Sequence, residues 1–217
     1  MTDYATLRRN MVDSQVAPNE VTNRGVLRAM GEVPRELFVS EAQKPVAYID
    51  QDLKLGGGRV LLSPMTVARL VQLAGIGAGD SVLEIGCGPG YLSAVAARLA
   101  GRVIGLESDP GLALLARQNL ATLGLGKAKV IEGPLEAGYP ADGPYDAVIL
   151  SGSVPEVPDR FARQVKEGGR LVAIIGEAAP GRLTVFTRFG NALSGQALYD
   201  APLAPLPGFE RVPAFVF

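Results

Sequence analysis

The chain has 217 residues, of which 47% are hydrophobic and 20% charged, and this composition is ordinary for a soluble α/β protein with one main core. The net charge of −1, without a run of Lys or Arg, argues against nucleic-acid binding, and no uncharged apolar run is long enough to span a membrane. Histidine is absent, which excludes a Ser-His-Asp triad and a histidine metal site, so we expect no bound metal. Cys87 is the only cysteine, and the N-terminus lacks the apolar core of a signal peptide. We therefore expect a cytoplasmic protein, while the sequence leaves its oligomeric state open.

The N-terminal part of the chain is predicted to be helical. Residues 4–31 show the apolar spacing of two helices separated by a break at Pro18-Asn19, and Thr22 is the expected N-cap of the second helix. These helices could form a lid over a ligand or cover one sheet edge, and the sequence favours the second arrangement. We expect residues 1–60 to form a helical segment packed on a domain of residues 61–217, in one globular unit.

A short strand or loop at residues 47–55 is predicted to run into a turn of three glycines. The next helix is expected to begin at Pro64, because Ser63 is a good N-cap and proline is favoured in the first helical turn. Capping accounts for Ser63 without a catalytic role.

The most informative stretch is residues 81–91. A short apolar strand that includes Glu84 is followed by three glycines at alternate positions, and the Ala-rich residues 92–100 are predicted to be helical. Strand, glycine turn and helix form the first half of a nucleotide-binding βαβ unit, in which glycine lets the backbone approach a ligand closely.

The glycine spacing separates two ligand classes. A dinucleotide fingerprint has the form G-x-G-x-x-G, whereas this turn is Gly86-x-Gly88-x-Gly90, with Tyr91 in the place of the last fingerprint glycine. Glu84 would repel a pyrophosphate but suits a cationic ligand such as S-adenosylmethionine (SAM), which has a sulfonium, an ammonium and no phosphate. The pattern resembles the first motif of the Rossmann-like SAM-dependent methyltransferases and argues against an NAD oxidoreductase.

A second buried strand is predicted at residues 102–107. It ends in Glu107, which lies 21 residues after Gly86 and so near the offset of about 20 residues expected for a carboxylate that binds ribose hydroxyls. A solvated carboxylate at a strand end is the alternative interpretation of Glu107. A helix at residues 110–123 and a strand at residues 129–132 are expected to follow.

The C-terminal half continues the alternation of strands and helices. Its predicted elements are strands at 144–150 and 170–175, an amphipathic helix from Val157 to Val165 ended by Gly168-Gly169, and a hairpin of 183–188 with 195–199 through Gly190-Asn191. The tail, ending in Phe215-Val216-Phe217, is expected to pack on the domain. This order predicts a doubly wound, mainly parallel sheet with an N-terminal helical extension and a C-terminal antiparallel hairpin. Ligands of such folds sit at the carboxyl ends of the strands.

More specific motifs lie outside the glycine turn, and over most of residues 8–176 the chain resembles the protein-L-isoaspartate O-methyltransferases. The residues that carry the resemblance are Met11-Val12, 26–30 with Val33-Pro34-Arg35, Ala47-Tyr48, 82–91, Pro144-Tyr145-Asp146, 155–158 and 166–171. The resemblance implies methyl transfer from SAM to the free carboxylate of an isoaspartyl residue in a damaged protein, leaving S-adenosylhomocysteine, as a form of protein repair. That carboxylate is ionised near neutral pH, so no general base is needed and the absence of histidine is accommodated.

The resemblance and the strand-end pattern together predict the site residues. The expected cofactor contacts are Glu84, Ile85, Gly86, Cys87, Gly88, Gly90, Tyr91, Glu107, Ser108, Glu132, Gly133, Pro134, Leu135 and Ser151. The only catalytic candidate is Ser63.

Two positions depart from the family pattern. The family serine that contacts the acceptor aligns with Leu62, which cannot hydrogen-bond a carboxylate, and Ser63 takes the place of the family glutamine. The acidic residue of the family turn after the third strand is Pro134 here, which offers neither a carboxylate nor an amide hydrogen. The acceptor is therefore predicted to be an isoaspartyl protein or peptide, or else an unidentified small molecule. A non-catalytic SAM-binding relative is the third alternative.

Overall fold

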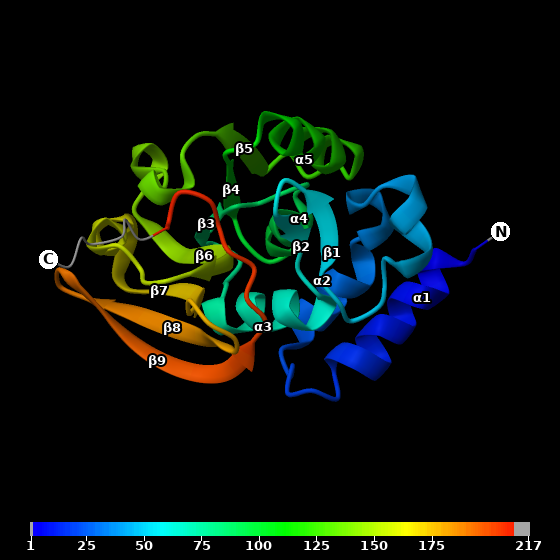
Figure 1. The fold of residues 1–217 in the computed structure, drawn as a ribbon, viewed down its shortest axis with the longest axis horizontal. Helices are drawn as coiled ribbons and strands as arrows, with labels where there is room; N and C mark the ends of the chain where they lie inside the picture. Colours follow the sequence, from blue (N-terminus) through cyan, green and yellow to red (C-terminus); the bar gives the residue numbers. More distant parts are fainter. Residues whose placement is uncertain (1, 211–217) are drawn as a thin grey trace, which may run out of the picture.

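The computed structural model describes residues 2–210, which form an α/β fold around a seven-stranded sheet (Figure 1). The strand order is β5-β4-β3-β6-β7-β8-β9. The pairings from β5 through β7 are parallel, and those of β7 with β8 and of β8 with β9 are antiparallel. The strands are β3 (Ser81–Ile85), β4 (Arg102–Glu107), β5 (Ala128–Glu132), β6 (Tyr145–Val154), β7 (Val165–Ile175), β8 (Gly181–Phe189) and β9 (Ala192–Ala201). The predicted mainly parallel sheet and its C-terminal hairpin are confirmed.

The two faces of the sheet are covered differently. Apolar residues of α3 (Pro64–Ala74), α4 (Tyr91–Ala97) and α5 (Pro110–Thr122) belong to the core on one face. The core on the other face is closed by Leu135 of the 3-10 helix η4 (Leu135–Ala137), by Phe161 of η6 (Asp159–Gln164), and by Leu206 and Phe209. A further 3-10 helix, η5, spans Pro140–Asp142. The segment after β9 thus forms part of a core.

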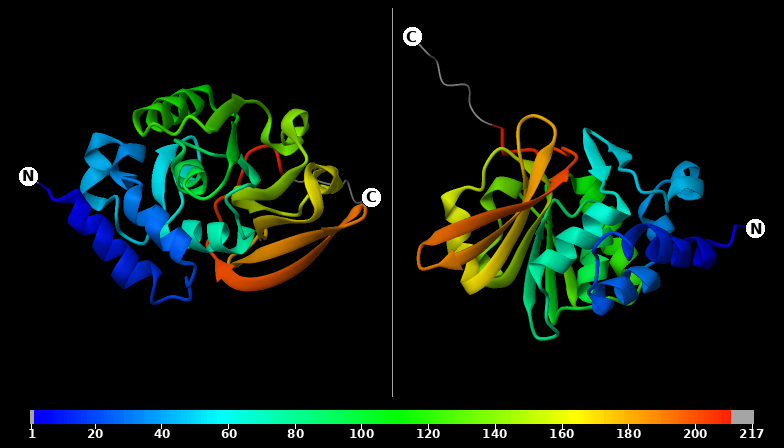
Figure 2. Two further views of the ribbon diagram at one scale, coloured as in Figure 1. Left: turned by 180° about the vertical axis from the view of Figure 1, so that it is seen from behind. Right: turned by 90° about the horizontal axis from the view of Figure 1, so that it is seen from below.

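The N-terminal helices pack on other helices. α1 (Tyr4–Asn10) continues as a π-helix, η1 (Met11–Val16), and α2 (Arg24–Glu32) follows. α2 contacts α3 and α4, and η1 contacts α3, so these segments pack on other helices, and the expectation that they cover a sheet edge stays a prediction. Figure 2 shows them at the end of the molecule opposite the tip of the β8–β9 hairpin. The division of the chain at residue 60 stays a prediction.

Two local predictions for the N-terminal region need correction. The N-cap of α2 is Asn23, whose Oδ1 accepts from the backbone N–H groups of Gly25 and Val26, while the Thr22 N–H donates to Gln72. Only the end of residues 47–55 is a strand: β1 (Leu53–Gly56) pairs antiparallel with β2 (Arg59–Leu61), after the 3-10 helices η2 (Arg35–Phe38) and η3 (Glu41–Val46). The N-cap role predicted for Ser63 at the start of α3 is confirmed.

The predicted helix from Val157 to Val165 is also corrected. The chain forms only the short 3-10 helix η6 there, and β7 begins at Val165, so the two glycines lie within a strand. A Cβ on Gly169 would stand 2.8 Å from the Asp146 carbonyl oxygen, which explains why this position needs glycine. Phe215-Val216-Phe217, expected to pack on the domain, lie outside the described residues.

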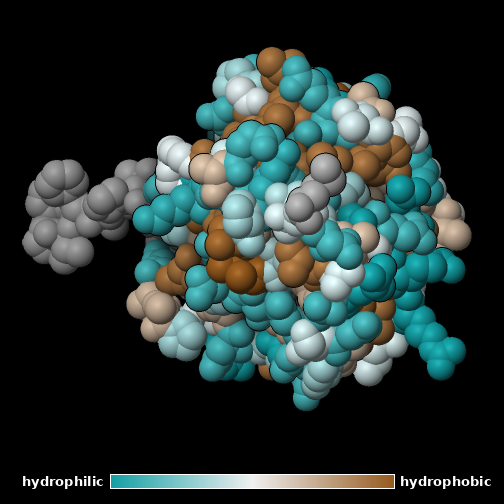
Figure 3. All heavy atoms as spheres, turned by 90° about the vertical axis from the view of Figure 1, so that its right-hand side faces the viewer, coloured by the Kyte–Doolittle hydropathy of each residue, from teal (hydrophilic) through white to brown (hydrophobic). Residues whose placement is uncertain are grey.

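The face that carries the N-terminal helices mixes hydrophobic and hydrophilic residues (Figure 3). Val46 and Ile49, which precede the β1–β2 hairpin, are exposed by 40% and 38%. No helix within residues 2–210 is long and apolar enough to cross a membrane.

Arg35 ties the N-terminal region to the sheet domain. Its side chain is fully buried, with Nε donating to the Ala47 carbonyl and Nη2 to the Leu62 carbonyl, both at 2.7 Å. The guanidinium lies 4.8 Å from the centre of the Tyr91 ring, at the start of α4. One side chain therefore connects η2, the segment before α3, and α4.

We predict that Arg35→Ala lowers the free energy of unfolding by about 3 kcal/mol, because it leaves two buried carbonyls without donors and removes packing from Tyr91. Urea unfolding measures the effect. Arg28→Ala, at an exposed position of α2, is the matched control and should change the value by less than about 0.5 kcal/mol. Equal stability of the two variants would contradict the role of Arg35.

Candidate cofactor site

The glycine turn between β3 and α4 has the conformation that its sequence predicts. Gly86, Gly88 and Gly90 have φ values of +78°, +54° and +95°, in the left-handed region that favours glycine. A Cβ on Gly90 would stand 3.2 Å from the Cβ of Ala116 in α5. The N–H groups of Gly86 and Cys87 both donate to the Leu106 carbonyl on β4, at 2.8 and 3.1 Å. The turn is therefore fixed against the neighbouring strand.

Glu84 is a buried carboxyl group on β3, immediately before the turn. It accepts hydrogen bonds from the hydroxyls of Ser93, on α4, and Ser151, on β6, the latter at 2.6 Å. Burial, with a smaller contribution from the nearby Glu107, raises the pKa of Glu84 to about 7 against the opposing effect of the two serine hydroxyls. The site thus holds a carboxyl group that changes charge near neutral pH.

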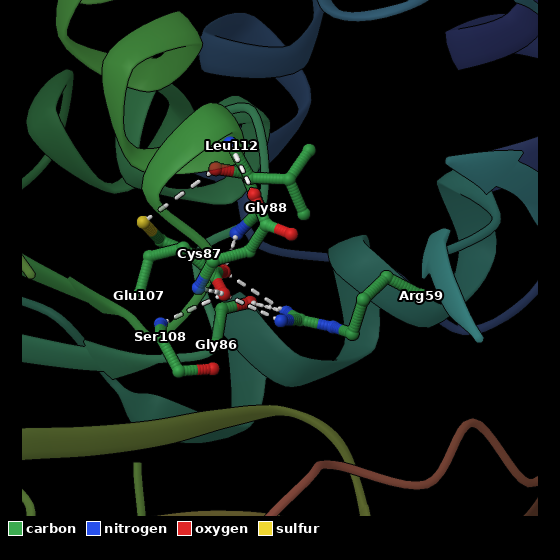
Figure 4. A network of polar contacts seen from close by, with 8 residues as sticks. Arg59, Gly86, Cys87, Gly88, Glu107, Ser108 and Leu112 are labelled. Carbon is green, nitrogen blue, oxygen red and sulfur yellow. Dashed lines mark hydrogen bonds and ion pairs between the residues drawn. The ribbon is translucent and has the colours of Figure 1, made fainter. Parts of the chain in front are cut away.

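Glu107, at the end of β4, is fully buried and takes part in a dense polar network (Figure 4). Its carboxylate accepts from three backbone N–H groups, those of Gly88 at 2.7 Å, Ser108 at 2.9 Å and Asp109 at 3.1 Å. Arg59 of β2 reaches across to the same carboxylate, with contacts of 2.5 and 3.0 Å, and also donates to the Gly86 carbonyl at 3.1 Å. The predicted ribose-binding carboxylate is therefore paired with a cation of the chain itself.

Leu206 lies over the first glycine of the turn. A Cβ placed on Gly86 would stand 2.6 Å from Leu206 Cδ2 and 3.1 Å from Arg59 Nη2, and 3.7 Å from Leu135. Three side chains from three separate segments therefore converge on the backbone of Gly86.

The remaining space at the glycine turn is very small. A cavity of about 20 Å³ is lined by Val60, Leu61, Leu62, Val67, Glu84, Gly86, Cys87, Gly88, Pro89, Tyr91, Leu92 and Ser151. That volume holds about one water molecule, whereas pockets for small organic ligands are roughly 300 Å³ or larger. This cavity is too small for a molecule of the size of SAM.

The predicted cofactor residues fall into three groups. Glu84, Gly86, Cys87, Gly88, Tyr91 and Ser151 line the small cavity, as does Leu62. Glu107 and Ser108 belong to the polar network beside the turn, Leu135 lies near Gly86, Ile85 is buried at the end of β3, and Gly90 packs against Ala116. Glu132 and Pro134 are exposed at the end of β5, where the N–H of Gly133 donates to the Glu107 carbonyl. Burial raises the pKa of the Cys87 thiol well above its usual range, so this thiol stays protonated.

Sequence reasoning missed two residues that lie against the glycine turn, Arg59 and Leu206. The sequence gives only a weak indication that Arg59 is buried: it shares with Leu61 one face of a short strand that follows three glycines. Leu206 carries none, because it lies in a proline-rich segment whose path depends on its hydrogen bonds to Ser153.

Leu62 and Ser63 occupy different environments. Leu62 is 4% exposed and lines the cavity, whereas the Ser63 hydroxyl caps α3 by accepting from the Thr66 N–H at 3.3 Å, and its own N–H donates to Asp52. The cavity thus has an apolar lining residue at the position that the resemblance assigns to a serine.

The fold has a glycine turn after β3, and β3 and β4 each carry a buried carboxyl group. These features define a Rossmann-like methyltransferase. Residues 7–203 match the model of the protein-L-isoaspartate(D-aspartate) O-methyltransferase family, and the chain belongs to this family. A protein-L-isoaspartate O-methyltransferase of Methanoregula boonei is 37% identical over 201 residues, which are 93% of each chain. The protein-L-isoaspartate O-methyltransferase 2 of an Anaeromyxobacter species is 40% identical over 167 residues, covering 77% of this chain and 69% of that one.

Solved structures agree with this assignment. A protein-L-isoaspartate O-methyltransferase structure superposes with a TM-score of 0.77 at 25% identity, covering 94% of this chain and 65% of that longer chain. A putative Plasmodium falciparum enzyme, in complex with S-adenosyl-L-homocysteine, gives a TM-score of 0.75 at 21% identity and covers 94% of this chain and 98% of that one.

Glu84 makes the stability of the protein depend on pH. Below pH 4.5 the Glu84 carboxyl group is protonated in both the folded and the unfolded chain. Between pH 4.5 and about 7 only the unfolded chain releases the proton, so the free energy of unfolding falls as the pH rises. We predict that this loss amounts to about 3 kcal/mol across the window and is absent in Glu84→Gln. Urea unfolding of both proteins from pH 4.5 to above pH 7 measures it, and parallel curves would contradict it.

Proposed function

We propose that the chain is a SAM-dependent O-methyltransferase that acts on the free carboxylate of isoaspartyl residues in damaged proteins or peptides. The observation that carries the proposal is the family match over residues 7–203, which includes the glycine turn and the two buried carboxyl groups at its edges. The cytoplasm, where damaged proteins would be repaired, is the proposed location.

The proposed cofactor contacts are those expected from the sequence, with Glu107 for the ribose hydroxyls and Glu84 facing the positively charged end of SAM. When bound, SAM supplies the methyl group as an electrophile. The chain itself would position an acceptor that is already ionised, so no residue has to remove a proton, which accords with a chain that has no histidine. In the structure Arg59 is bonded to Glu107 and Leu206 lies against Gly86, so both side chains would have to move for SAM to bind in this way.

Two observations favour a different acceptor on the same scaffold. Leu62 presents an apolar surface to the cavity, and the exposed Pro134 replaces an acidic family residue. A methyltransferase for a small unidentified acceptor, or a relative without catalytic activity, would retain the same fold.

The test is methyl transfer from labelled SAM to an isoaspartyl peptide, with the corresponding aspartyl peptide as control. We expect base-labile label on the isoaspartyl peptide alone, and about tenfold higher kcat/KM for Leu62→Ser, which restores one hydrogen bond to a charged acceptor. Binding of S-adenosylhomocysteine without transfer to either peptide would contradict the proposed acceptor.

Ser63 remains the candidate for contact with the acceptor, and Ser63→Ala tests it in the same assay. If the hydroxyl only caps α3, the variant loses about 1 kcal/mol of stability and keeps its kcat/KM. We expect this result, because both the hydroxyl and the N–H of Ser63 are engaged at the start of α3. A large fall in kcat/KM with unchanged folding would instead assign Ser63 to the acceptor site.

A further inference from the structure

We propose that Arg59 and Leu206 form an occluding pair that keeps the cofactor site closed until both side chains withdraw. The inference rests on the proposed function, since it concerns the site in which SAM would bind. With such a pair, the affinity for the cofactor depends on the free energy needed to open the site as well as on the contacts that the bound cofactor makes.

The polar member of the pair, Arg59, occupies the position from which a ribose would contact Glu107. Its side chain is 8% exposed and its two terminal nitrogens lie on the carboxylate. A ribose would also offer hydrogen-bond donors, so the carboxylate can exchange one set of donors for the other while keeping its three backbone N–H bonds. Arg59 is therefore a competitor for the ribose position.

The glycine turn before Arg59 leaves room for the hairpin to rotate. Gly56, Gly57 and Gly58 lie at the turn between β1 and β2 with positive φ values, and no atom beyond each glycine's own chain neighbours lies within 4 Å of where its Cβ would be. A glycine turn without packing around it absorbs backbone rotation at low cost. Arg59 follows these glycines directly, so a rotation of the hairpin would carry its side chain away from Glu107.

The apolar member, Leu206, lies on a segment that we term the strap, residues 203–209. The strap is fixed beside the end of β6 by the Ser153 N–H bond to the Ala204 carbonyl, at 2.7 Å, and by the Leu206 N–H bond to the Ser153 carbonyl, at 3.0 Å. Beyond Leu206, the Phe209 ring stacks on Phe161 with centroids 6.2 Å apart. The closed position is therefore held on both sides of Leu206.

Two glycines at the ends of adjacent strands leave space for the strap. A Cβ on Gly152 of β6 would stand 2.5 Å from the Ala204 carbonyl oxygen and 2.7 Å from Leu206 Cγ. Gly152 and Gly86, at the ends of two adjacent strands, thus provide the space that the Leu206 side chain fills. Since the same space lies directly above the glycine turn, a ligand bound there has to displace Leu206.

The test compares the binding of S-adenosylhomocysteine to four folded proteins by calorimetry. The wild-type chain is compared with Leu206→Ala, Arg59→Gln and the control Leu203→Ala, which truncates a leucine of the same strap that packs on Gly176 and Gly181 instead of Gly86. We expect roughly tenfold tighter binding for Leu206→Ala and Arg59→Gln and a change of less than about twofold for Leu203→Ala. Circular dichroism verifies folding, because truncating a buried leucine is destabilising.

Amide hydrogen exchange provides a second readout that does not depend on activity. Saturating S-adenosylhomocysteine should speed exchange at the N–H groups of Leu206 and Ser153 in the wild-type chain, because the strap has to leave β6. Unchanged or slower exchange at both positions would overturn the role of the strap.

The outcomes separate the two proposals. If the wild-type chain binds S-adenosylhomocysteine and neither Leu206→Ala nor Arg59→Gln binds it more tightly, the occluding pair is wrong and the proposed function stands. If none of the four folded proteins binds it, the proposed function fails and the occluding pair fails with it. If binding appears or tightens only in the two opened variants, both are supported.

Discussion

The rest of the site depends on the buried carboxylate of Glu107. A carboxylate without solvent requires several donors, and here they come from the glycine turn, from the start of the next loop, and from Arg59 of a separate hairpin. Satisfying this one group fixes the backbone of Gly88, the direction of the chain after β4, and the docking of β2 on the sheet. The positions of the turn and of the hairpin thus follow from the same requirement.

The two buried glutamates, Glu84 and Glu107, lie on adjacent strands but have different hydrogen-bond donors around them. Glu107 is matched by a guanidinium and three N–H groups, whereas Glu84, on the adjacent strand, accepts from the hydroxyls of Ser93 and Ser151 and has no cation bonded to it among the described residues. Burial therefore raises the pKa of Glu84 to about 7. A cation brought close to Glu84 would favour its ionised form. The site thus has one carboxylate already neutralised by the chain and one that would respond to a positively charged ligand.

Much of the fold could be predicted from the sequence because it rests on local patterns. The strand, glycine turn and helix around Gly86 depend on residues adjacent in the chain, and the placement of Glu107 follows from their spacing. Arg59 and Leu206 could not be placed, because their positions depend on the packing of a hairpin and a strap against strands distant in sequence. The helix expected from Val157 to Val165 is a further case, because an amphipathic pattern does not show that the chain forms only the short η6 there and enters β7 at Val165.

Closure of the site links the stability of the protein to its ligand binding. The pairing of Arg59 with Glu107 and the burial of Leu206 are contacts that stabilise the fold, yet they occupy the volume that a cofactor needs. A ligand that displaces them has to supply equivalent hydrogen bonds and apolar contacts, and only the surplus appears as affinity. Leu62 is part of the apolar lining of the small cavity at the glycine turn. The same few side chains therefore control whether the site is open and what it accepts.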